Sequence, residues 1–278
     1  DNPAVPVGEF VDCLNAHKNA GRIRAFGGSN WSIERLEAAN AYARAHGLTG
    51  FAASSPNLSL AAWNEPMWPG CLTASDRRSR DWYARAGMPL FSWSSQATGF
   101  FTGRYRPEDR DRPGLEKIVR TWFNDDNFAR LERAQEMARR KGVTAGQIAL
   151  AWVLCQPLPT FALVGPQTID ELRDLLPALG PRGFFITLQN GLVGLDLLQV
   201  FGPERVVPGC VLWGASMIAP GAYELTASGP FLLQGGAAAA AAAARELLSL
   251  VFPVRPCPDI AAALWSKLAI SASFTSLG

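Results

Sequence analysis

The chain has 278 residues, of which 48% are hydrophobic and 18% are charged, and its formal net charge is +2. This composition is typical of a compact folded protein and excludes a disordered one, while the small net charge argues against nucleic-acid binding. No apolar run approaches the roughly 20 residues that a membrane-spanning helix requires. Five widely spaced cysteines and two histidines argue against a zinc site and favour a reducing compartment, which we take to be the cytoplasm.

Strands and helices alternate over the first two thirds of the chain. Short apolar runs predict strands at residues 22–26, 50–54, 89–93 and 160–164. Helical periodicity predicts helices at residues 7–20, 32–46, 75–86, 127–141, 144–155 and 169–178. The segment 104–126, rich in Arg, Asp and Pro, is expected to be a long excursion. Four strands that alternate with helices indicate parallel βα units, so the expected fold class is α/β, with half of a (β/α)8 TIM-type barrel in residues 1–179.

The sequence changes character at 177–183, where prolines and glycines cluster, and we place a domain boundary there. Apolar runs between turn residues predict extended segments at 184–188, 206–216 and 223–234. The eight alanines at 237–244 begin a predicted helix that runs to about residue 250, because alanine is the strongest helix former. A last helix is predicted at 259–277. Residues 180–278 are therefore expected to form a small α/β segment with a C-terminal helix.

The stretch around the first strand resembles a segment of a known family. Gly21-Arg-Ile-Arg-Ala-Phe-Gly-Gly-Ser-Asn-Trp31 is similar to the G-K-I-R-x-x-G-x-S-N segment of the aldo/keto reductases. From the residues alone, it is a strand closed by two glycines, followed by a turn and a helix with Ser32 as its N-cap. The resemblance implies that Ser29 and Asn30 hydrogen-bond the carboxamide of a nicotinamide cofactor.

Three further segments resemble the same family, in the family's own order. The resemblance implies that the nicotinamide ring stacks on Trp93, and it places Ser55 where the family commonly has a Gln that contacts the same group. The loop after Trp93 is similar to the family's loop around the cofactor pyrophosphate, and its expected binding residues are Ser94, Gln96 and Gly99. The last segment resembles the loop that holds the adenosine 2′-phosphate, with Gly165, Gln167 and Thr168 as its expected binding residues.

The resemblance covers residues 1–179 and equates them with the C-terminal half of an aldo/keto reductase. It implies NADP as the cofactor, with NAD as the alternative, because Gln167 is neutral where the family usually has Arg or Lys. The family's proton donor, a Tyr that works with Lys, Asp and His, comes from the other half of the barrel. We expect this tetrad to be missing, because the tyrosines of the chain do not stand at a predicted strand end beside a lysine: Tyr42, Tyr83, Tyr105 and Tyr223.

Residues 182–278 resemble a second oxidoreductase family, the ketopantoate reductases. The matching segments include Ile186-Thr-Leu-Gln-Asn-Gly191 and Leu264-Trp-Ser-Lys-Leu268. This resemblance implies that Asn190 lies near the nicotinamide and the substrate and that Lys267 is the catalytic acid/base. From the residues alone, Lys267 is equally a solvated charge on an amphipathic helix. Ser271 stands where the family has a substrate-binding Asn.

Three hypotheses of function follow. The first is an NAD(P)-dependent carbonyl reductase made of two truncated modules, and the second is a non-catalytic nucleotide-binding or scaffold protein. The third is a fused or misassembled reading frame with no activity of its own; the first residue, Asp1 rather than Met, favours a fragment. The expected partners are a nicotinamide cofactor and a small carbonyl substrate, with neither nucleic acid nor membrane. The open edges of a half barrel also predict self-association.

Overall fold

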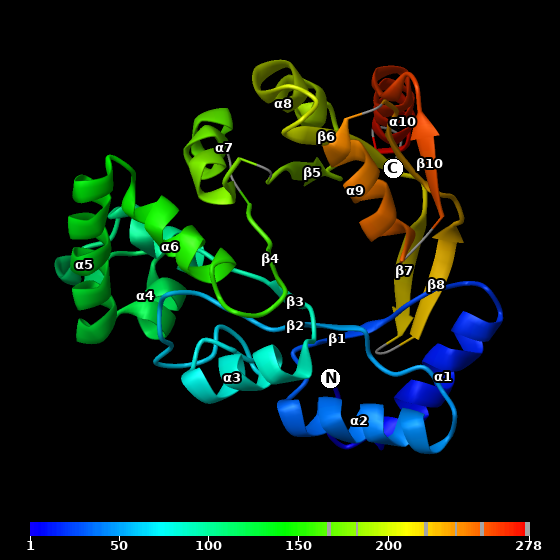
Figure 1. Ribbon diagram of the computed structural model, residues 1–278, viewed down its shortest axis with the longest axis horizontal. Coiled ribbons are helices and arrows are strands. Elements are labelled where there is room, and N and C mark those ends of the chain that lie inside the picture. The colour runs from blue at the N-terminus through cyan, green and yellow to red at the C-terminus, as the bar shows by residue number, and fades with distance from the viewer. Residues whose placement is uncertain (166–167, 182, 220–221, 237, 251–252, 276–278) are drawn as a thin grey trace. The chain divides into compact units, whose positions relative to one another are not determined.

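The computed structural model describes residues 1–165, 168–181, 183–219, 222–236, 238–250 and 253–275. The chain forms two compact units, Asp1–Gly180 (unit 1) and Pro181–Gly278 (unit 2) (Figure 1). Among the described residues, no helix combines the length and the hydropathy needed to cross a membrane.

Unit 1 is built on a parallel sheet in the order β1-β2-β3-β4. Its strands are β1 (Gly27–Ser29), β2 (Ala53–Ser55), β3 (Leu90–Ser92) and β4 (Thr160–Ala162). Its α-helices are α1 (Val7–Asn19), α2 (Ile33–Ala45), α3 (Arg77–Ala86), α4 (Glu116–Trp122), α5 (Asp125–Lys141), α6 (Ala145–Leu154) and α7 (Ile169–Leu175). Its 3-10 helices are η1 (Ala97–Thr102), η2 (Pro107–Asp111) and η3 (Leu176–Leu179). The predicted α/β class and the parallel arrangement of the four strands are thus confirmed.

The first strand does not lie where the sequence predicts it. Residues 22–26 are not a strand, and β1 instead begins at Gly27, the first of two glycines that we interpreted as the end of a strand. A Cβ atom on Gly27 would lie 2.6 Å from the carbonyl oxygen of Ala53, and one on Gly28 would lie 2.9 Å from Cγ of Trp31. The two glycines therefore permit the close approach of β1 to its neighbours instead of ending it. The second strand is displaced in the same direction and begins at Ala53.

The segment 104–126 is more regular than predicted. It contains η2 and α4, two short helices that were not predicted. The reason is burial: Ile118 and Trp122 of α4 are in the core, where the Trp122 ring packs at 6.0 Å from Trp63. An amphipathic turn of this length gains its stability from packing rather than from local propensity.

The helix after β1 begins as predicted. The Oγ atom of Ser32 accepts the N–H of Arg35 at 3.2 Å, so Ser32 is the N-cap of α2. Leu36 and Ala39 of this helix are fully buried in a core that also contains Tyr83 of α3 and Leu90 of β3. Figure 1 shows α2 and α3 on one side of the strands. Local capping and the packing of one helix face together position the carboxyl end of β1.

Unit 2 contains a mixed sheet in the order β10-β9-β6-β5 and a separate antiparallel pair, β7 and β8. Its strands are β5 (Phe185–Thr187), β6 (Val206–Val211), β7 (Gly214–Ala219), β8 (Ala222–Ala227), β9 (Phe231–Gln234) and β10 (Val254–Cys257). Its helices are α8 (Val193–Phe201), α9 (Ala239–Ser249) and α10 (Ile260–Thr275). The alanine run forms α9 as predicted, although Ala237 lies outside the described residues. Neither α8 nor β10 was predicted from the sequence.

The two faces of the unit 1 sheet differ in burial. The register places Gly28, Ser54 and Leu90 on one face, and all three are buried. The opposite face carries Ser29 and, on β4, Phe161, which is 37% exposed and stacks on Phe91 with ring centroids 4.7 Å apart. Since β1 and β4 are the edges of this sheet, each has one side without a strand partner among the described residues.

We predict that the protein self-associates through these edges, because unpaired parallel edge strands offer backbone groups to another chain. Phe161→Lys should weaken the association by about tenfold or more, since a charge on an edge strand opposes pairing. Sedimentation velocity over a range of protein concentrations measures the effect. Met137→Lys, which changes an exposed apolar residue on α5, is the matched control and should leave the association unchanged. A single monomeric species at every concentration would contradict the prediction.

Candidate functional site

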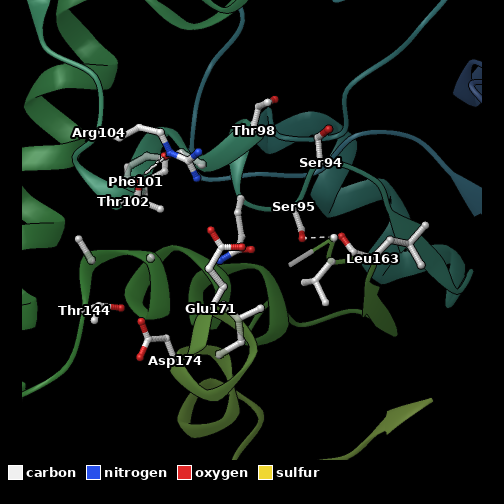
Figure 2. Close-up of a pocket in the computed structure, with 17 residues that line it drawn as sticks. Ser94, Ser95, Thr98, Phe101, Thr102, Arg104, Thr144, Leu163, Glu171 and Asp174 are labelled. Atoms are coloured by element: carbon white, nitrogen blue, oxygen red, sulfur yellow. Dashed lines mark hydrogen bonds between the residues drawn. The ribbon is translucent and has the colours of Figure 1, made fainter. Parts of the chain in front are cut away.

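A pocket of about 510 Å³ lies where β3 and β4 end (Figure 2). It is bounded by the turn after β3, by the residues after β4, by the first turn of α6 and by one side of α7. The polar residues that line it are Ser94, Ser95, Gln96, Thr98, Thr102, Arg104, Thr144, Glu171 and Asp174. The carboxyl ends of parallel strands are where α/β proteins commonly bind ligands.

The turn after β3 has an unusual backbone. Ser94, Ala97 and Thr98 have φ angles of 46°, 50° and 55°, and Gly99 has 78°. Non-glycine residues in the left-handed region are strained, and they persist only where the surroundings hold them. Here Ala97 is fully buried, and the buried Oγ of Ser95 donates a hydrogen bond to the carbonyl of Leu163 at 3.0 Å, as Figure 2 shows. The turn after β3 is thus tied to the residues that follow β4.

The first turn of α6 adds backbone donors to the pocket. Thr144 is the N-cap, and its Oγ1 accepts the N–H of Gln147 at 3.2 Å, while the Gln147 side chain accepts the N–H of Thr144. Ala145 and Gly146, the next two residues, line the pocket. The first N–H groups of a helix have no partner within the helix, and they favour a negatively charged ligand.

The charges of the pocket are of both signs. The guanidinium group of Arg104 packs against Gly99, and its Nε donates a hydrogen bond to Oγ1 of Thr102 at 3.0 Å. In the view of Figure 2, Arg104 lies above Asp174 of α7, and the side chain of Glu171 of α7 reaches into the space between them. A ligand with an anionic group and with amino or hydroxyl donors would satisfy both sides. Of the predicted residues, Ser94, Gln96, Gly99 and Gly165 line this pocket.

A second group of predicted residues meets at the ends of β1 and β2. Oγ of Ser29 donates a hydrogen bond to the carbonyl of Ser55 at 3.3 Å, and so does the backbone N–H of Asn30 at 3.2 Å. The side-chain oxygen of Asn30 accepts the N–H of Leu72 at 3.0 Å. Oγ of Ser55 donates to the carbonyl of Phe91 at 2.8 Å. The side chains of Ser29 and Ser55 therefore join neighbouring strands, and that of Asn30 binds the loop at Leu72, roles that were not predicted from the sequence.

Trp93 lies in an aromatic cluster. Its ring is 4.7 Å from that of Trp68 with an interplanar angle of 30°, and 5.7 Å from that of Trp63. Trp68 is 42% exposed, and Nζ of Lys117 lies 5.2 Å from its ring centroid. One face of Trp93 is therefore covered by Trp68, which a ring that stacks on that face would have to displace.

The other predicted residues lie elsewhere. Thr168 is the N-cap of α7, where its Oγ1 accepts the N–H of Glu171 at 3.1 Å, and Gln167 lies outside the described residues. Asn190 is exposed after β5 in unit 2. Lys267 of α10, also in unit 2, is half-buried and donates from Nζ to the carbonyl of Val211 at 2.7 Å.

The phenol groups of three tyrosines form hydrogen bonds within unit 1. Tyr42 donates a hydrogen bond to the carboxylate of Asp12, which raises the pKa of Tyr42 above its ordinary value. Burial raises the pKa of Tyr83, and its hydrogen bond with Ser54 offsets part of this shift. Tyr105 donates to the carbonyl of Thr98 at 3.4 Å. A raised pKa makes a phenol a weaker proton donor, so neither Tyr42 nor Tyr83 has the tuning of a catalytic acid.

Three residues that line the pocket were not predicted as site residues from the sequence: Arg104, Thr144 and Asp174. Arg104 opens the Arg-, Asp- and Pro-rich segment 104–126, for which no binding role was predicted, although glycines at 99 and 103 flank its turn. Thr144 and Gln147 have the spacing of a capping box, which marks the start of a helix and hence a set of free backbone donors. Asp174 gave no local signal, because only the packing of α7 brings it to the pocket.

A parallel sheet with a polar pocket at its strand ends defines a class of α/β proteins that bind ligands there. The chain belongs to the aldo/keto reductase family, whose model matches residues 1–180. A second family model, ketopantoate reductase PanE/ApbA, matches residues 165–237, a range that contains Asn190 but not Lys267.

Curated relatives resemble the chain at low identity. It is 25% identical over 209 residues to the uncharacterized oxidoreductase YrpG of Bacillus subtilis, covering 75% of this chain and 58% of that one. It is 24% identical over 180 residues to versiconal hemiacetal acetate reductase of Aspergillus parasiticus, covering 63% and 49%. It is 25% identical over 190 residues to a probable voltage-gated potassium channel subunit beta of Oryza sativa subsp. japonica, covering 64% and 55%. The chain spans about half the length of the curated relatives it matches.

A solved structure that this chain resembles is that of the thermostable aldo-keto reductase Tm1743 in complex with the inhibitor epalrestat. It has a TM-score of 0.44 and 18% sequence identity, and it covers 73% of this chain and 56% of that one. A TM-score of that size supports no argument about the site.

We predict that Asn57→Ala lowers the free energy of unfolding by about 2–3 kcal/mol, because it leaves buried partners unsatisfied. Asn57 is fully buried, donates from Nδ2 to the carbonyl of Trp93 at 2.9 Å and accepts from Oγ1 of Thr73 at 2.9 Å. Ser29→Ala, which removes only long hydrogen bonds at an exposed residue, should change it by less than about 0.5 kcal/mol. Urea unfolding followed by circular dichroism measures both, and equal effects would contradict the role given to Asn57.

Proposed function

We propose that residues 1–180 are the C-terminal, cofactor-binding half of an aldo/keto reductase barrel and that they bind NADP, with NAD as a weaker ligand. The observation that carries this proposal is the pocket at the ends of β3 and β4. There the strained turn after β3, Arg104 and the first turn of α6 combine donors that suit phosphate oxygens.

The pocket has groups of two kinds that suit a dinucleotide: donors for its phosphates and acceptors for its adenosine. Arg104, the hydroxyl of Ser94 and the N–H groups of Ala145 and Gly146 would hold the phosphates. Glu171 and Asp174 would accept hydrogen bonds from amino or hydroxyl groups of the adenosine. The cofactor, when reduced and bound, supplies a hydride. Within the proposal, Ser29, Asn30 and Ser55 lie at neighbouring strand ends, where they would orient its carboxamide.

The reaction class that such a site serves is the reduction of a small carbonyl compound. Hydride transfer to a carbonyl also needs a proton donor, and the family's Tyr, Lys, Asp and His belong to the other half of the barrel. The described phenols of this chain are engaged with Asp12, Ser54 and Thr98. We therefore propose that this chain binds the cofactor without supplying the family's acid, and that Lys267 is the candidate proton donor of unit 2.

A non-catalytic, nucleotide-binding protein is the second candidate function. The engagement of the described phenols favours it, since a binding protein needs the pocket but no acid.

Titration with NADPH, followed by calorimetry, tests the proposal. We expect saturable binding, which Arg104→Ala weakens by about tenfold or more because a charge-assisted contact to phosphate is lost. Arg110→Ala, which removes an exposed arginine from the same segment outside the pocket, is the matched control and should bind as the parent does. No binding at millimolar NADPH would overturn both candidate functions.

A panel of aldehydes and ketones then separates the two candidates. NADPH oxidation that depends on a carbonyl compound supports the reductase, and binding without turnover supports the binding protein. If turnover occurs and Lys267→Ala leaves it unchanged, Lys267 is not the proton donor.

We predict that Trp68→Ala strengthens NADPH binding by about tenfold, because the ring of Trp68 covers one face of Trp93 and need no longer be displaced. The variant should bind 2′,5′-ADP, which has no nicotinamide ring, with unchanged affinity. Calorimetric titration with both ligands measures the difference. NADPH affinity that is unchanged or weaker would show that Trp68 does not compete for that face.

A further inference from the structure

A second pocket of unit 1 lies along α5 and α6, and none of the described residues that line it also lines the pocket at the ends of β3 and β4. Its volume is about 750 Å³. The described residues that line it are Leu60, Arg130, Arg133, Ala134, Met137, Lys141, Val143, Gln147, Ile148, Ala151, Trp152, Cys155, Pro177 and Ala178. We call it the α5–α6 groove.

Helical spacing builds the two walls of this groove. On α5, its lining residues recur at intervals of three and four positions and so form one stripe: Arg130, Arg133, Ala134, Met137 and Lys141. The wall on α6 consists of Ile148, Ala151, Trp152 and the C-cap residue Cys155. The small side chains of Ala134 and Ala151 leave a furrow between the helices, and Met137, 39% exposed, is a flexible apolar side chain at its rim.

The groove combines an apolar floor with a cationic rim. Arg130 is already engaged, since it donates to the carbonyl of Leu60 at 2.7 Å and pairs with Asp126 at 2.7 Å. Arg133 and Lys141 are exposed and have no hydrogen bond or ion pair with any residue that the structure describes. None of the described residues that line the groove is acidic. No described acidic residue of the groove therefore balances the positive charges of Arg133 and Lys141.

We propose that the α5–α6 groove binds an amphiphilic carboxylate, with an alkyl chain along the furrow and the carboxylate at Arg133 and Lys141. An alkyl chain fits because the floor offers aliphatic and indole surface with few polar partners. A carboxylate fits because a guanidinium and an ammonium group both bind it through charge-assisted hydrogen bonds. This ligand is chemically different from the dinucleotide, and the proposal does not depend on the function of the other pocket.

The alkylation rate of Cys155 measures how far the groove is filled by a ligand, because Cys155 is an exposed free thiol that lines the groove. The intact protein is alkylated with iodoacetamide, and peptide mass mapping follows each cysteine separately. Dodecanoate below its micelle-forming concentration should slow the alkylation of Cys155 by roughly fivefold or more as the groove fills. Cys13, the other exposed thiol, lies on α1 outside the groove and should react at an unchanged rate. Dodecyltrimethylammonium, which has the same chain and the opposite charge, should not protect Cys155.

Paired variants test the role of the charges. Arg133→Gln with Lys141→Gln should raise the dodecanoate concentration for half protection by about tenfold or more. Arg139→Gln with Arg140→Gln removes the same charge from the same helix outside the groove and should leave that concentration unchanged.

Three results would overturn the proposal. They are no protection of Cys155, equal protection by the cationic amphiphile, and protection that survives the loss of Arg133 and Lys141. Loss of the circular dichroism signal, or slower alkylation of Cys13 as well, would show a general effect of the amphiphile and would likewise count against the groove.

Discussion

The buried amide of Asn57 holds together the strand ends on which the rest of unit 1 depends. Its backbone N–H donates to the carbonyl of Leu72 at 2.8 Å, and its backbone carbonyl accepts the N–H of Ala74 at 2.7 Å. Its side chain binds the carbonyl of Trp93, where β3 ends. Leu72 in turn donates to Asn30 after β1. Since a buried amide must satisfy its hydrogen bonds, this one residue relates the ends of β1, β2 and β3.

The pocket depends on a second constraint, the strained turn after β3. Buried Ala97 and the bond from Ser95 to Leu163 hold left-handed residues that would be unfavourable in a free loop. The same turn positions Gly99 against Arg104 and so brings a cation to the pocket. The proposed nicotinamide contacts are different in kind, because Ser29, Asn30 and Ser55 already bind one another or neighbouring strands. A ligand there would have to exchange existing hydrogen bonds.

The two units of the chain are matched by models of two different families. The aldo/keto reductase model ends at residue 180, where unit 1 ends, while the ketopantoate reductase model begins at residue 165, before the boundary. Each unit contains a short sheet of its own. Lys267 is bound to the carbonyl of Val211 within unit 2, next to Cys210, whose thiol pKa is raised by burial and lowered in part by that ammonium group.

Local signals in the sequence were enough for the alternation of strands and helices, for the cap at Ser32 and for the helix of the alanine run. These features depend on hydrogen bonds and propensities within a few residues. The sequence alone did not place β1, because Gly27 and Gly28 have their meaning only against Ala53 and Trp31. Nor did it show Trp68 on Trp93, or Arg104 opposite Asp174. Those relations were decided by the tertiary structure, because they join residues that only the packing of separate elements brings together.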